Sequence, residues 1–287
     1  MDVSGKVVFV TGGAAGIGFG IASAFAARGA KIMLADINEA QLETAAAALA
    51  ATGADVGTVV CDVADEQAVR RAATATIERF GKVHIVCNNA GVGAGGRAGE
   101  SALEDWRWIV DINLMGVVHG IEVFTPLIKS HGDGGYFINT ASMAGHVASP
   151  AMASYHATKF AVVGYSEALK DDLARDNIGV SVLCPAWVRT KIYDSRLNSP
   201  TVKAANGSDQ GPANFSAMKD VVDNGIAPEL VGEWTVDCVE AERFYIFTHP
   251  SMLAHIDARH EQIRSDYAAC AADERLAAEP EPMPIPT

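Results

Sequence analysis

The sequence predicts an α/β fold built on one doubly wound, seven-stranded parallel sheet. Short apolar runs alternate with stretches of helical periodicity along most of the chain. Each run is apolar almost throughout, which is typical of a strand that is buried on both faces. The first run leads through a glycine-rich turn directly into a helical pattern. Alternation of this kind favours parallel strands that are joined by right-handed crossovers.

The individual elements follow from these runs and from the residues that end them. Pro185 stops the sixth strand, and Asn38, with Gln41 three positions later, is a helix start. Strands are expected over 6–10, 31–35, 56–61, 83–87, 135–140, 180–184 and 243–248. Helices are expected from the first turn to residue 29 and over 38–52, 65–80, 103–130, 153–176, 228–241 and 251–278, with a weaker pattern over 214–225.

The 287 residues suit one large α/β domain or two small ones. No internal repeat and no linker divides residues 1–250, so we expect a single domain there. A long polar segment follows Pro185 and predicts a mobile lid over about 190–225. Residues 251–287 are expected to add a C-terminal helix and a proline-rich tail.

Composition limits the partners and the compartment. The net charge of -13 argues against nucleic acid, an anionic membrane or an acidic carrier protein. No uninterrupted apolar run reaches the roughly 18 residues that cross a bilayer, and the N-terminus lacks the order of a signal segment. The five cysteines form no C-x-x-C pair, which favours free thiols in a reducing compartment. The eight histidines are scattered, so no metal site is expected. We therefore expect a cytoplasmic protein.

The glycine-rich turn predicts a dinucleotide site. Gly12, Gly16 and Gly18 lie between a strand and a helix, where glycines let a pyrophosphate approach the backbone at the helix N-terminus. Asp36 ends the second strand, and a carboxylate there accepts hydrogen bonds from the ribose hydroxyls and repels a 2′-phosphate. No Arg or Lys lies between Thr11 and Phe19. These residues favour NAD over NADP.

Tyr155 and Lys159 predict a proton-transfer pair. Four residues apart on a helix, their side chains share one face. A tyrosine hydroxyl has a pKa of about 10, and a neighbouring ammonium group favours the phenolate and lowers that pKa. The pair is thus a candidate general acid and base. Taken alone, this spacing can also arise from two unrelated residues on an exposed helix turn.

The motifs together resemble the short-chain dehydrogenase/reductase family, in its single-domain form with a Rossmann-type sheet. The similarity covers residues 4–190 closely and continues loosely to Pro250. The chain has Pro185-Ala186 where the family often has Pro-Gly. The matching residues are Thr11-Gly12-x-x-x-Gly16-x-Gly18, Asp62, Asn88-Asn89-Ala90-Gly91, Asn113, Ser142, Tyr155-x-x-x-Lys159, Pro185, Val188 and Thr190.

The resemblance implies a role for each of these residues. Asn113, Ser142, Tyr155 and Lys159 are the expected catalytic residues, with Asn113 holding a water near the lysine and Ser142 binding the substrate oxygen. Asp62 and the Val63 backbone are expected at the adenine, and Val188 and Thr190 at the carboxamide. The full set expected to bind the cofactor is Gly12, Gly16, Ile17, Gly18, Asp36, Asp62, Val63, Asn89, Ala90, Gly91, Tyr155, Lys159, Val188 and Thr190.

We therefore expect hydride transfer between NAD(H) and a secondary alcohol or its ketone, with Tyr155 moving the hydroxyl proton. The long lid favours a bulky substrate, and the ending 245–250 resembles family members that oxidise bulky, often aromatic, secondary alcohols. Trp187, Tyr193, Met143 and His146 are candidate pocket walls, and ordinary packing is the alternative for each.

The two long helices predict an oligomer. Residues 160–163 and 114–118 are consecutively apolar, and such helices need cover on more than one face. A second subunit related by two-fold symmetry would supply it, so a homodimer is expected. The resemblance implies that a homotetramer is also open, although the 37 residues beyond Pro250 can block or replace its second interface.

Two other functions remain open at this point. One is a regulator that binds NAD(H) without catalysing a reaction. The presence of all four expected catalytic residues argues against it. The other is a reductase of carrier-bound 3-oxoacyl chains, which would want NADP and a basic docking face. Asp36 and the net charge of -13 speak against it.

Overall fold

Seven parallel strands form one sheet in the order β3-β2-β1-β4-β5-β6-β7. The computed structural model describes residues 1–205 and 214–278, without the side chains of residues 214–218. The parallel pairing of all seven strands confirms the sheet that the sequence predicts. The strands are β1 (Val7–Thr11), β2 (Lys31–Asp36), β3 (Val56–Val60), β4 (Ile85–Asn88), β5 (Gly135–Thr140), β6 (Ile178–Cys184) and β7 (Tyr245–Phe247).

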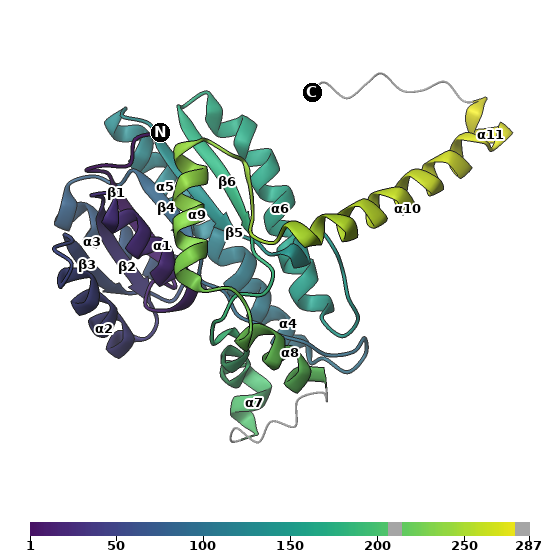
Figure 1. Ribbon diagram of the computed structural model, residues 1–287, viewed down its shortest axis with the longest axis horizontal. Coiled ribbons are helices and arrows are strands. Elements are labelled where there is room, and N and C mark those ends of the chain that lie inside the picture. Colours follow the sequence, from purple (N-terminus) through teal and green to yellow (C-terminus); the bar gives the residue numbers. More distant parts are fainter. Residues whose placement is uncertain (206–213, 279–287) are drawn as a thin grey trace. The chain divides into compact units, whose positions relative to one another are not determined.

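Helices cover both faces of this sheet (Figure 1). One core cluster joins one face of the strands to α1 (Gly16–Ala27), α2 (Glu39–Ala50) and α9 (Pro228–Glu240). The other cluster joins the opposite face to α3 (Glu66–Phe80), α5 (Gly116–His131) and α6 (Ala153–Ala174). This is the three-layer arrangement that an alternating pattern requires, because each amphipathic helix must bury its apolar face against the sheet.

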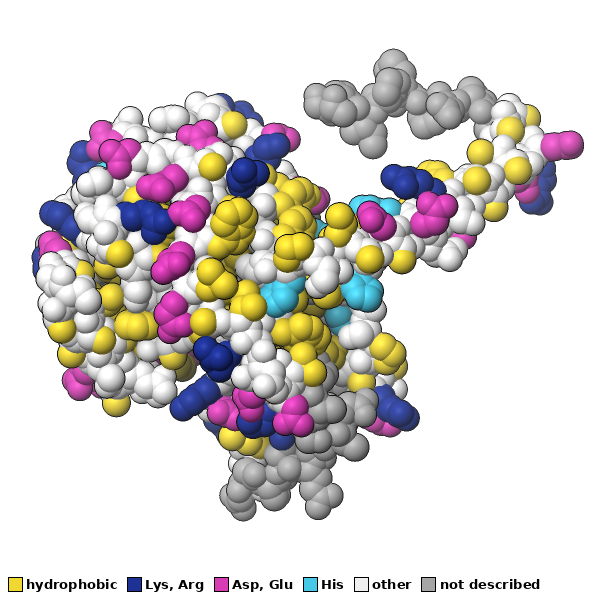
Figure 2. All heavy atoms as spheres, in the orientation of Figure 1, with side chains coloured by type: hydrophobic (Ala, Val, Ile, Leu, Met, Phe, Trp, Pro, Cys, Tyr) yellow, Lys and Arg dark blue, Asp and Glu magenta, His cyan; other side chains and the backbone are white. Residues whose placement is uncertain are grey.

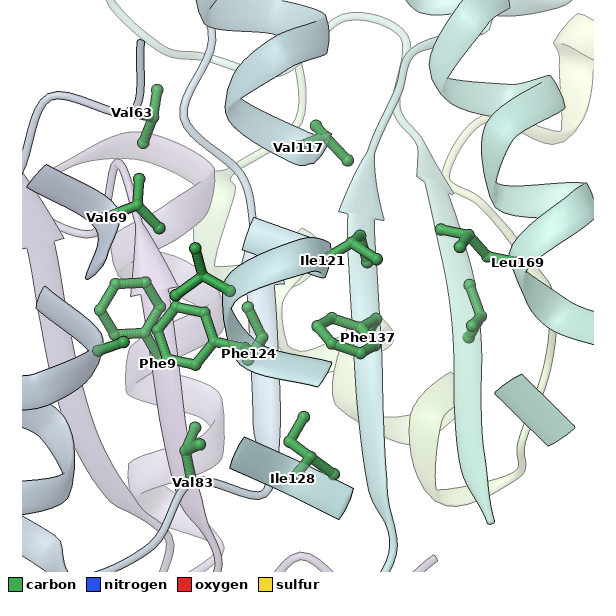
Figure 3. Packing of buried hydrophobic residues seen from close by; sticks show 14 of the residues in the cluster. Phe9, Val63, Val69, Val83, Val117, Ile121, Phe124, Ile128, Phe137 and Leu169 are labelled. Atoms are coloured by element: carbon green, nitrogen blue, oxygen red, sulfur yellow. The ribbon is translucent and has the colours of Figure 1, made fainter. Parts of the chain in front are cut away.

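Alternate residues of β1 show how one strand serves both cores. Phe9 points into the α3–α5–α6 side, where its ring lies 4.6 Å from that of Phe124, centroid to centroid. Val8 and Val10 point to the other side and join the α1–α2–α9 core. Figure 3 shows Phe9, Phe124 and Phe137 at the centre of the first core. The sheet is thus buried on both faces, as apolar strands of this kind predict.

The expected helix over 103–130 is interrupted. It consists of α4 (Leu103–Val110), a π-helical turn η1 (Asp111–Met115) and α5. The whole run 103–131 is long and apolar enough on average to cross a membrane, although it contains no uninterrupted apolar run of that length. Its apolar side chains, among them Ile121 and Phe124, fill the core beside the sheet (Figure 3).

The segment after β6 contains more regular structure than the sequence predicts. It folds into η3 (Ile192–Asn198) and α7 (Pro200–Ala204), which were not expected. It then forms α8 (Asn214–Asp223), which corresponds to the weaker helical pattern expected over 214–225. Ser199 starts α7 by accepting a hydrogen bond from the Val202 amide, with Pro200 in the first turn. Residues 206–213 of the expected lid lie outside the described residues.

The chain divides into two compact units, residues 1–248 with the whole sheet and residues 249–287. The second unit contains η4 (Pro250–Met252), α10 (Leu253–Ala271) and α11 (Glu274–Ala277). A helix was expected here, and α10 accounts for most of it. The expected proline-rich tail, residues 279–287, lies outside the described residues.

Candidate active site

The predicted site residues gather at the carboxyl ends of the central strands. β1 lies between β2 and β4 in the sheet. Successive strands are added on one side of β1 up to β3, and from β4 onward they are added on the other side, so the strand order reverses between β1 and β4. In doubly wound sheets a crevice opens at this switch point, and ligands bind there. The turns that follow β1, β4 and β5 all start from this edge.

The turn between β1 and α1 has room for backbone only. Gly12 has φ of 61°, in the left-handed region that favours glycine. A Cβ atom on Gly18 would lie 2.1 Å from the carbonyl oxygen of Gly12. Ala15 precedes α1 without capping it through its side chain, and the first turn of this helix carries no acidic residue. Its first amides therefore suit an anionic phosphate group.

Thr11 ties this turn to the turn that follows β4. Its hydroxyl oxygen accepts hydrogen bonds from the amides of Asn89 (2.9 Å) and Ala90 (3.0 Å). Asn89 returns the contact, because its Nδ2 donates to the carbonyl oxygen of Thr11 over 3.0 Å. The two turns thus form one rigid edge. The sequence motif includes Thr11, but sequence reasoning gave this residue no role.

Asp36 holds its carboxylate beside the glycine-rich turn. One oxygen accepts from the Ala14 amide over 3.3 Å, and the other from the Asn38 amide over 3.0 Å. Asp62 is exposed after β3 and accepts from the Ala64 amide, while Val63 is buried beside it. Asp36 is the last residue of β2, and Asp62 follows the end of β3 by two residues, so both carboxylates lie at the carboxyl edge of the sheet.

Lys159 connects α6 to the central strands. The side chain is 4% exposed, and its Nζ donates to the carbonyl oxygen of Thr140 over 2.9 Å. The same nitrogen lies 5.7 Å from the centroid of the Tyr155 ring. It also lies 3.6 Å from the position that a Cβ atom on Gly91 would occupy. The amine is therefore next to both the tyrosine and the turn after β4.

Ser142 lies at the end of β5 and hydrogen-bonds Tyr155. Its hydroxyl also donates to the Pro185 carbonyl oxygen over 3.3 Å and accepts from the Ala144 amide over 3.1 Å. Ser142, in the turn after β5, thus meets Tyr155 of α6, and Lys159 of the same helix lies beside that tyrosine. Asn113 lies near this group, because a Cβ atom on Gly91 would be 3.3 Å from its Oδ1 and 3.6 Å from Lys159 Nζ.

Burial has the largest effect on the pKa values of Tyr155 and Lys159. It raises the pKa of Tyr155, and the hydrogen bond with Ser142 acts against that rise. Burial also lowers the pKa of Lys159 to about 8, because the charged ammonium loses water, and the neighbouring Cys184 acts in the opposite direction. The sequence assigns the lowering of the tyrosine pKa to Lys159. In this structure Ser142 has that effect.

Asn113 joins three parts of the site through its side chain. It lies in η1 and is 1% exposed. Its Oδ1 accepts from the Val92 amide over 2.8 Å, and its Nδ2 donates to the Val92 carbonyl oxygen over 2.9 Å. Nδ2 also donates to the Thr158 hydroxyl over 3.4 Å. The side chain thus binds the loop after β4 to α6.

The segment after β6 returns to the same edge. Val188 is buried and pairs with Ile226. A methyl group of Thr190 lies 3.1 Å from the position of a Cβ atom on Gly16, which places Thr190 beside the glycine-rich turn. Burial raises the pKa of Tyr193 to about 12, and the negative charge of ionised Tyr155 adds to this rise. The Tyr193 hydroxyl thus lies within electrostatic range of the predicted acid and base.

The other three candidate pocket walls differ in burial and in the direction of their side chains. Met143 is buried in the protein interior. His146 points toward β7, with Nε2 3.3 Å from the Cys184 sulfur and its ring edge-on to those of Tyr245 and Phe247. Trp187 is 38% exposed. Tyr193 is therefore the candidate wall whose hydroxyl lies within electrostatic range of Tyr155.

His156 is a residue at this site that sequence reasoning missed. It is buried on α6, directly after Tyr155. Nδ1 bonds the Ala144 carbonyl oxygen over 2.9 Å, and Nε2 bonds the Ser149 amide over 3.0 Å. Because a carbonyl accepts and an amide donates, the proton lies on Nδ1. His156 thus holds the loop after β5 against α6. The only sign of this role in the sequence was that His156 directly follows Tyr155.

A family model described as short chain dehydrogenase matches residues 6–200. A relative from Lactiplantibacillus plantarum, "CLA biosynthesis dehydrogenase/reductase", is 37% identical over 93% of this chain and 96% of its own length. The "C alpha-dehydrogenase" of a Sphingobium species is 30% identical over 95% of this chain and 90% of its own length.

A solved structure extends the comparison. A short chain dehydrogenase/reductase from Burkholderia phymatum, crystallised in complex with NAD, is 38% identical. It superposes with a TM-score of 0.87 and covers 93% of this chain and 96% of its own. The similarity therefore extends over most of the chain.

Proposed function

The chain belongs to the short-chain dehydrogenase family of oxidoreductases, and on that premise we propose that it transfers hydride between NAD(H) and a bulky secondary alcohol or its ketone. The observation that carries this proposal is the position of Lys159. Its amine lies between the Tyr155 ring and the Gly91 turn, and so joins the predicted acid and base to the predicted cofactor edge. Residues 1–250 would supply this activity.

NAD fits the residues at this edge. The uncapped start of α1 suits a pyrophosphate, and the carboxylate of Asp36 lies beside the same turn. A 2′-phosphate placed there would meet that negative charge, which favours NAD over NADP. The NAD complex of the Burkholderia protein, which shares the fold and 38% of the sequence, supports the same choice.

The cofactor, when bound, supplies the hydride acceptor or donor, and the chain's own residues handle the proton. Tyr155 takes the proton of the substrate hydroxyl, and in the reverse direction gives a proton to the carbonyl oxygen. Ser142 orients that oxygen, because its hydroxyl already bonds the tyrosine. Lys159 holds the nicotinamide ribose. Asn113 keeps the loop after β4 in place beside them.

The remaining predicted contacts complete the cofactor site. Asp62 and Val63 would receive the adenine, and Ile17 lies in the first turn of α1. Val188 and Thr190 would contact the carboxamide, in line with the position of Thr190 beside Gly16. Asn89, Ala90 and Gly91 would border the ribose.

A bulky substrate is supported by the segment after β6. η3 brings Tyr193 toward Tyr155, so an aromatic wall lies close to the reacting hydroxyl. Ser195 of the same helix accepts a hydrogen bond from the Gly93 amide over 2.9 Å and thus binds this segment to the loop after β4. The relatives are named dehydrogenases, which agrees with the reaction class.

The test is an NAD-coupled screen of aromatic, alicyclic and steroidal secondary alcohols with the purified full-length protein. We expect NADH formation with at least one class. Tyr155→Phe should lower turnover by about 10²- to 10⁴-fold, the usual contribution of a general acid or base. The same variant should bind NAD with nearly unchanged affinity in calorimetry. NAD binding without turnover on any substrate would favour the regulator, whereas turnover only of carrier-bound 3-oxoacyl chains would favour the acyl reductase.

We also propose a homodimer that pairs α5 and α6 across a two-fold axis, with a homotetramer as the larger assembly. The outward face of α6 carries exposed small residues, Ala157, Gly164 and Ala168, which allow a second helix to approach closely. Leu114 and Val118 are half-buried on the neighbouring helical run. Sedimentation at micromolar concentration tests this, and a monomer there would rule it out.

A further inference from the structure

We infer that α10 is an association surface for a second copy of this chain, which it meets as an antiparallel helix pair. The seam of α10 is a stripe of residues spaced alternately by three and four positions. This spacing is the a and d pattern of a coiled coil, in which the stripe stays on one side of the helix. The seam consists of Leu253, Ile256, His260, Ile263, Tyr267 and Cys270.

The seam is exposed within the described residues of the second unit. No residue of α10 is buried, and Leu253, Ile263 and Tyr267 are 60%, 38% and 73% exposed. Neither core cluster includes a residue beyond Ile246. α10 is one uninterrupted helix of 19 residues (Figure 1). Helices in proteins gain most of their stability when an apolar face packs against another surface, so an exposed stripe on α10 favours a partner.

Charges beside the seam select both the partner and its direction. Figure 2 shows charged side chains of both signs along α10. Asp257 and Arg264 occupy one flank of the seam, the e positions, and Arg259 and Asp266 occupy the other flank, the g positions. In an antiparallel pair, e residues face e residues and g residues face g residues. A second copy therefore offers a complementary charge to each of these four side chains.

The register follows from aligning the two seams. With the two-fold axis between residues 261 and 262, every a residue of one helix meets a d residue of the other. Leu253 then meets Cys270 of the second copy, Ile256 meets Tyr267, and His260 meets Ile263. At a rise of 1.5 Å per residue, the facing residues Asp257 and Arg264 are offset by about 3 Å along the axis, within reach of an ion pair.

A parallel pair does not have this complementarity. There, g residues face the e residues of the next heptad, so Arg259 of each helix would face Arg264 of the other. Two like-charge contacts would replace four attractive ones. The flanking charges thus act against the parallel arrangement and favour the antiparallel one.

Disulfide trapping tests the register with the full-length chain. Cys270 is the exposed cysteine, and the other four are buried. Leu253→Cys should form a disulfide-linked dimer under mild oxidation, through the introduced thiol of one copy and the native Cys270 thiol of the other. Leu253→Cys with Cys270→Ser should give no linked dimer. The unmodified chain should also give none, because antiparallel Cys270 residues lie about 25 Å apart along the axis.

Each other outcome overturns the proposal. Linked dimers of the unmodified chain, or of the variant that lacks Cys270, would show parallel pairing or random collision. Absence of linked dimers with Leu253→Cys would show that the seam is covered by something else, such as the first unit of another copy. Ala254→Cys, which points away from the seam, is the matched control and should not cross-link.

Charge reversal provides a second test in the Leu253→Cys background. Arg264→Asp should slow cross-linking about fivefold, because both exposed ion pairs with the facing Asp257 residues become like-charge contacts. Adding Asp257→Arg should restore the rate, because the facing charges are then only exchanged. Ser265→Asp, which lies on the side of α10 away from the seam and its flanks, should have no effect. Faster cross-linking of Arg264→Asp alone would indicate parallel pairing and refute the proposal. These readouts do not depend on turnover, so they can fail while the proposed reaction stands.

Discussion

The amide side chain of Asn113 is paired with the main chain of Val92 in both directions, over 2.8 and 2.9 Å. This exchange of two hydrogen bonds imitates the contact between neighbouring strands. It fixes the loop after β4, which has left the sheet by this point, to the π-helical turn η1. The loop therefore has a defined position beside Lys159 even though it has no strand partner.

Replacing Asn113 by Ala should destabilise the protein and impair substrate binding. The partly buried amide and carbonyl of Val92 lose their partners, which costs at most about 1–3 kcal/mol in free energy of unfolding for each group. We expect the KM for the alcohol to rise more than the KM for NAD, because the loop borders the substrate side. Denaturant unfolding and steady-state kinetics measure both. Asp111→Ala, at an exposed position of the same turn, is the control. An Asn113→Ala protein as stable as the parent would contradict this account.

The fold was predictable because its information is local. Buried parallel strands are continuous apolar runs, so each of the seven strands was placed within a few residues. The cap of α2 was equally readable, since Asn38 accepts from the Gln41 amide as expected. Ser199 followed by Pro200 was a similar helix start that sequence reasoning passed over.

The details of the site were less predictable because they depend on distant contacts. The break at η1 has no marker in its own sequence, and the partner of Asn113 is 21 residues away along the chain. The spacing of Tyr155 and Lys159 predicted a shared helix face. It could not show that a carbonyl on β5 would take the amine, or that Ser142 would be the group bonded to the phenol.

Asp36 should decide between NAD and NADP. Asp36→Asn keeps an oxygen that can accept from the Ala14 or Asn38 amide, but it removes the negative charge. The ratio of kcat/KM for NAD over NADP should fall about 5- to 30-fold, because the loss of the charge relieves about 1–2 kcal/mol of repulsion. Asp62→Asn, at an exposed carboxylate after β3, is the matched control and should change this ratio less. An unchanged ratio in Asp36→Asn would show that another residue selects the cofactor.

Lys159 should make stability depend on pH in the alkaline range. The pKa of this amine is about 8 in the folded protein, below its ordinary value of 10.5. Between these values the unfolded chain binds more protons, so the folded state gains stability as the pH rises from 8 to 10.5. Lys159→Met should lack this gain, which is at most about 3 kcal/mol. Unfolding curves at pH 8 and pH 10 measure it. Parallel pH dependence of the two proteins would contradict the lowered pKa.

Lys159→Met should also lose turnover, because no ammonium group then remains to hold the nicotinamide ribose. Lys159→Arg retains the charge but carries a larger group into a buried position, and we expect it to restore NAD binding better than turnover. Calorimetric titration with NAD, beside kinetics, separates the two effects. Full turnover by Lys159→Met would remove the lysine from the proposed reaction.

His84 should make stability depend on pH in the acidic range. Burial lowers the pKa of His84 to about 4, and the positive charge of Lys6 acts in the same direction. Its Nδ1 accepts a hydrogen bond from the Val7 amide over 3.1 Å, which requires the unprotonated nitrogen. Because the folded pKa lies below the ordinary value of 6.5, the unfolded chain binds more protons between these values. Stability is therefore complete above about pH 6.5 and falls as the pH drops toward 4.

His84→Asn separates this titration from the hydrogen bond. An asparagine oxygen can accept from the Val7 amide, but it does not titrate. The variant should therefore lose less stability than the parent between pH 7 and pH 5, by about 1–2 kcal/mol, as each pH unit in this window is worth up to 1.4 kcal/mol. His255→Asn, on the exposed surface of α10, should leave the parent's pH dependence unchanged. If His84→Asn and the parent lose stability equally on acidification, the acid sensitivity arises at other groups, and burial of this imidazole does not control it.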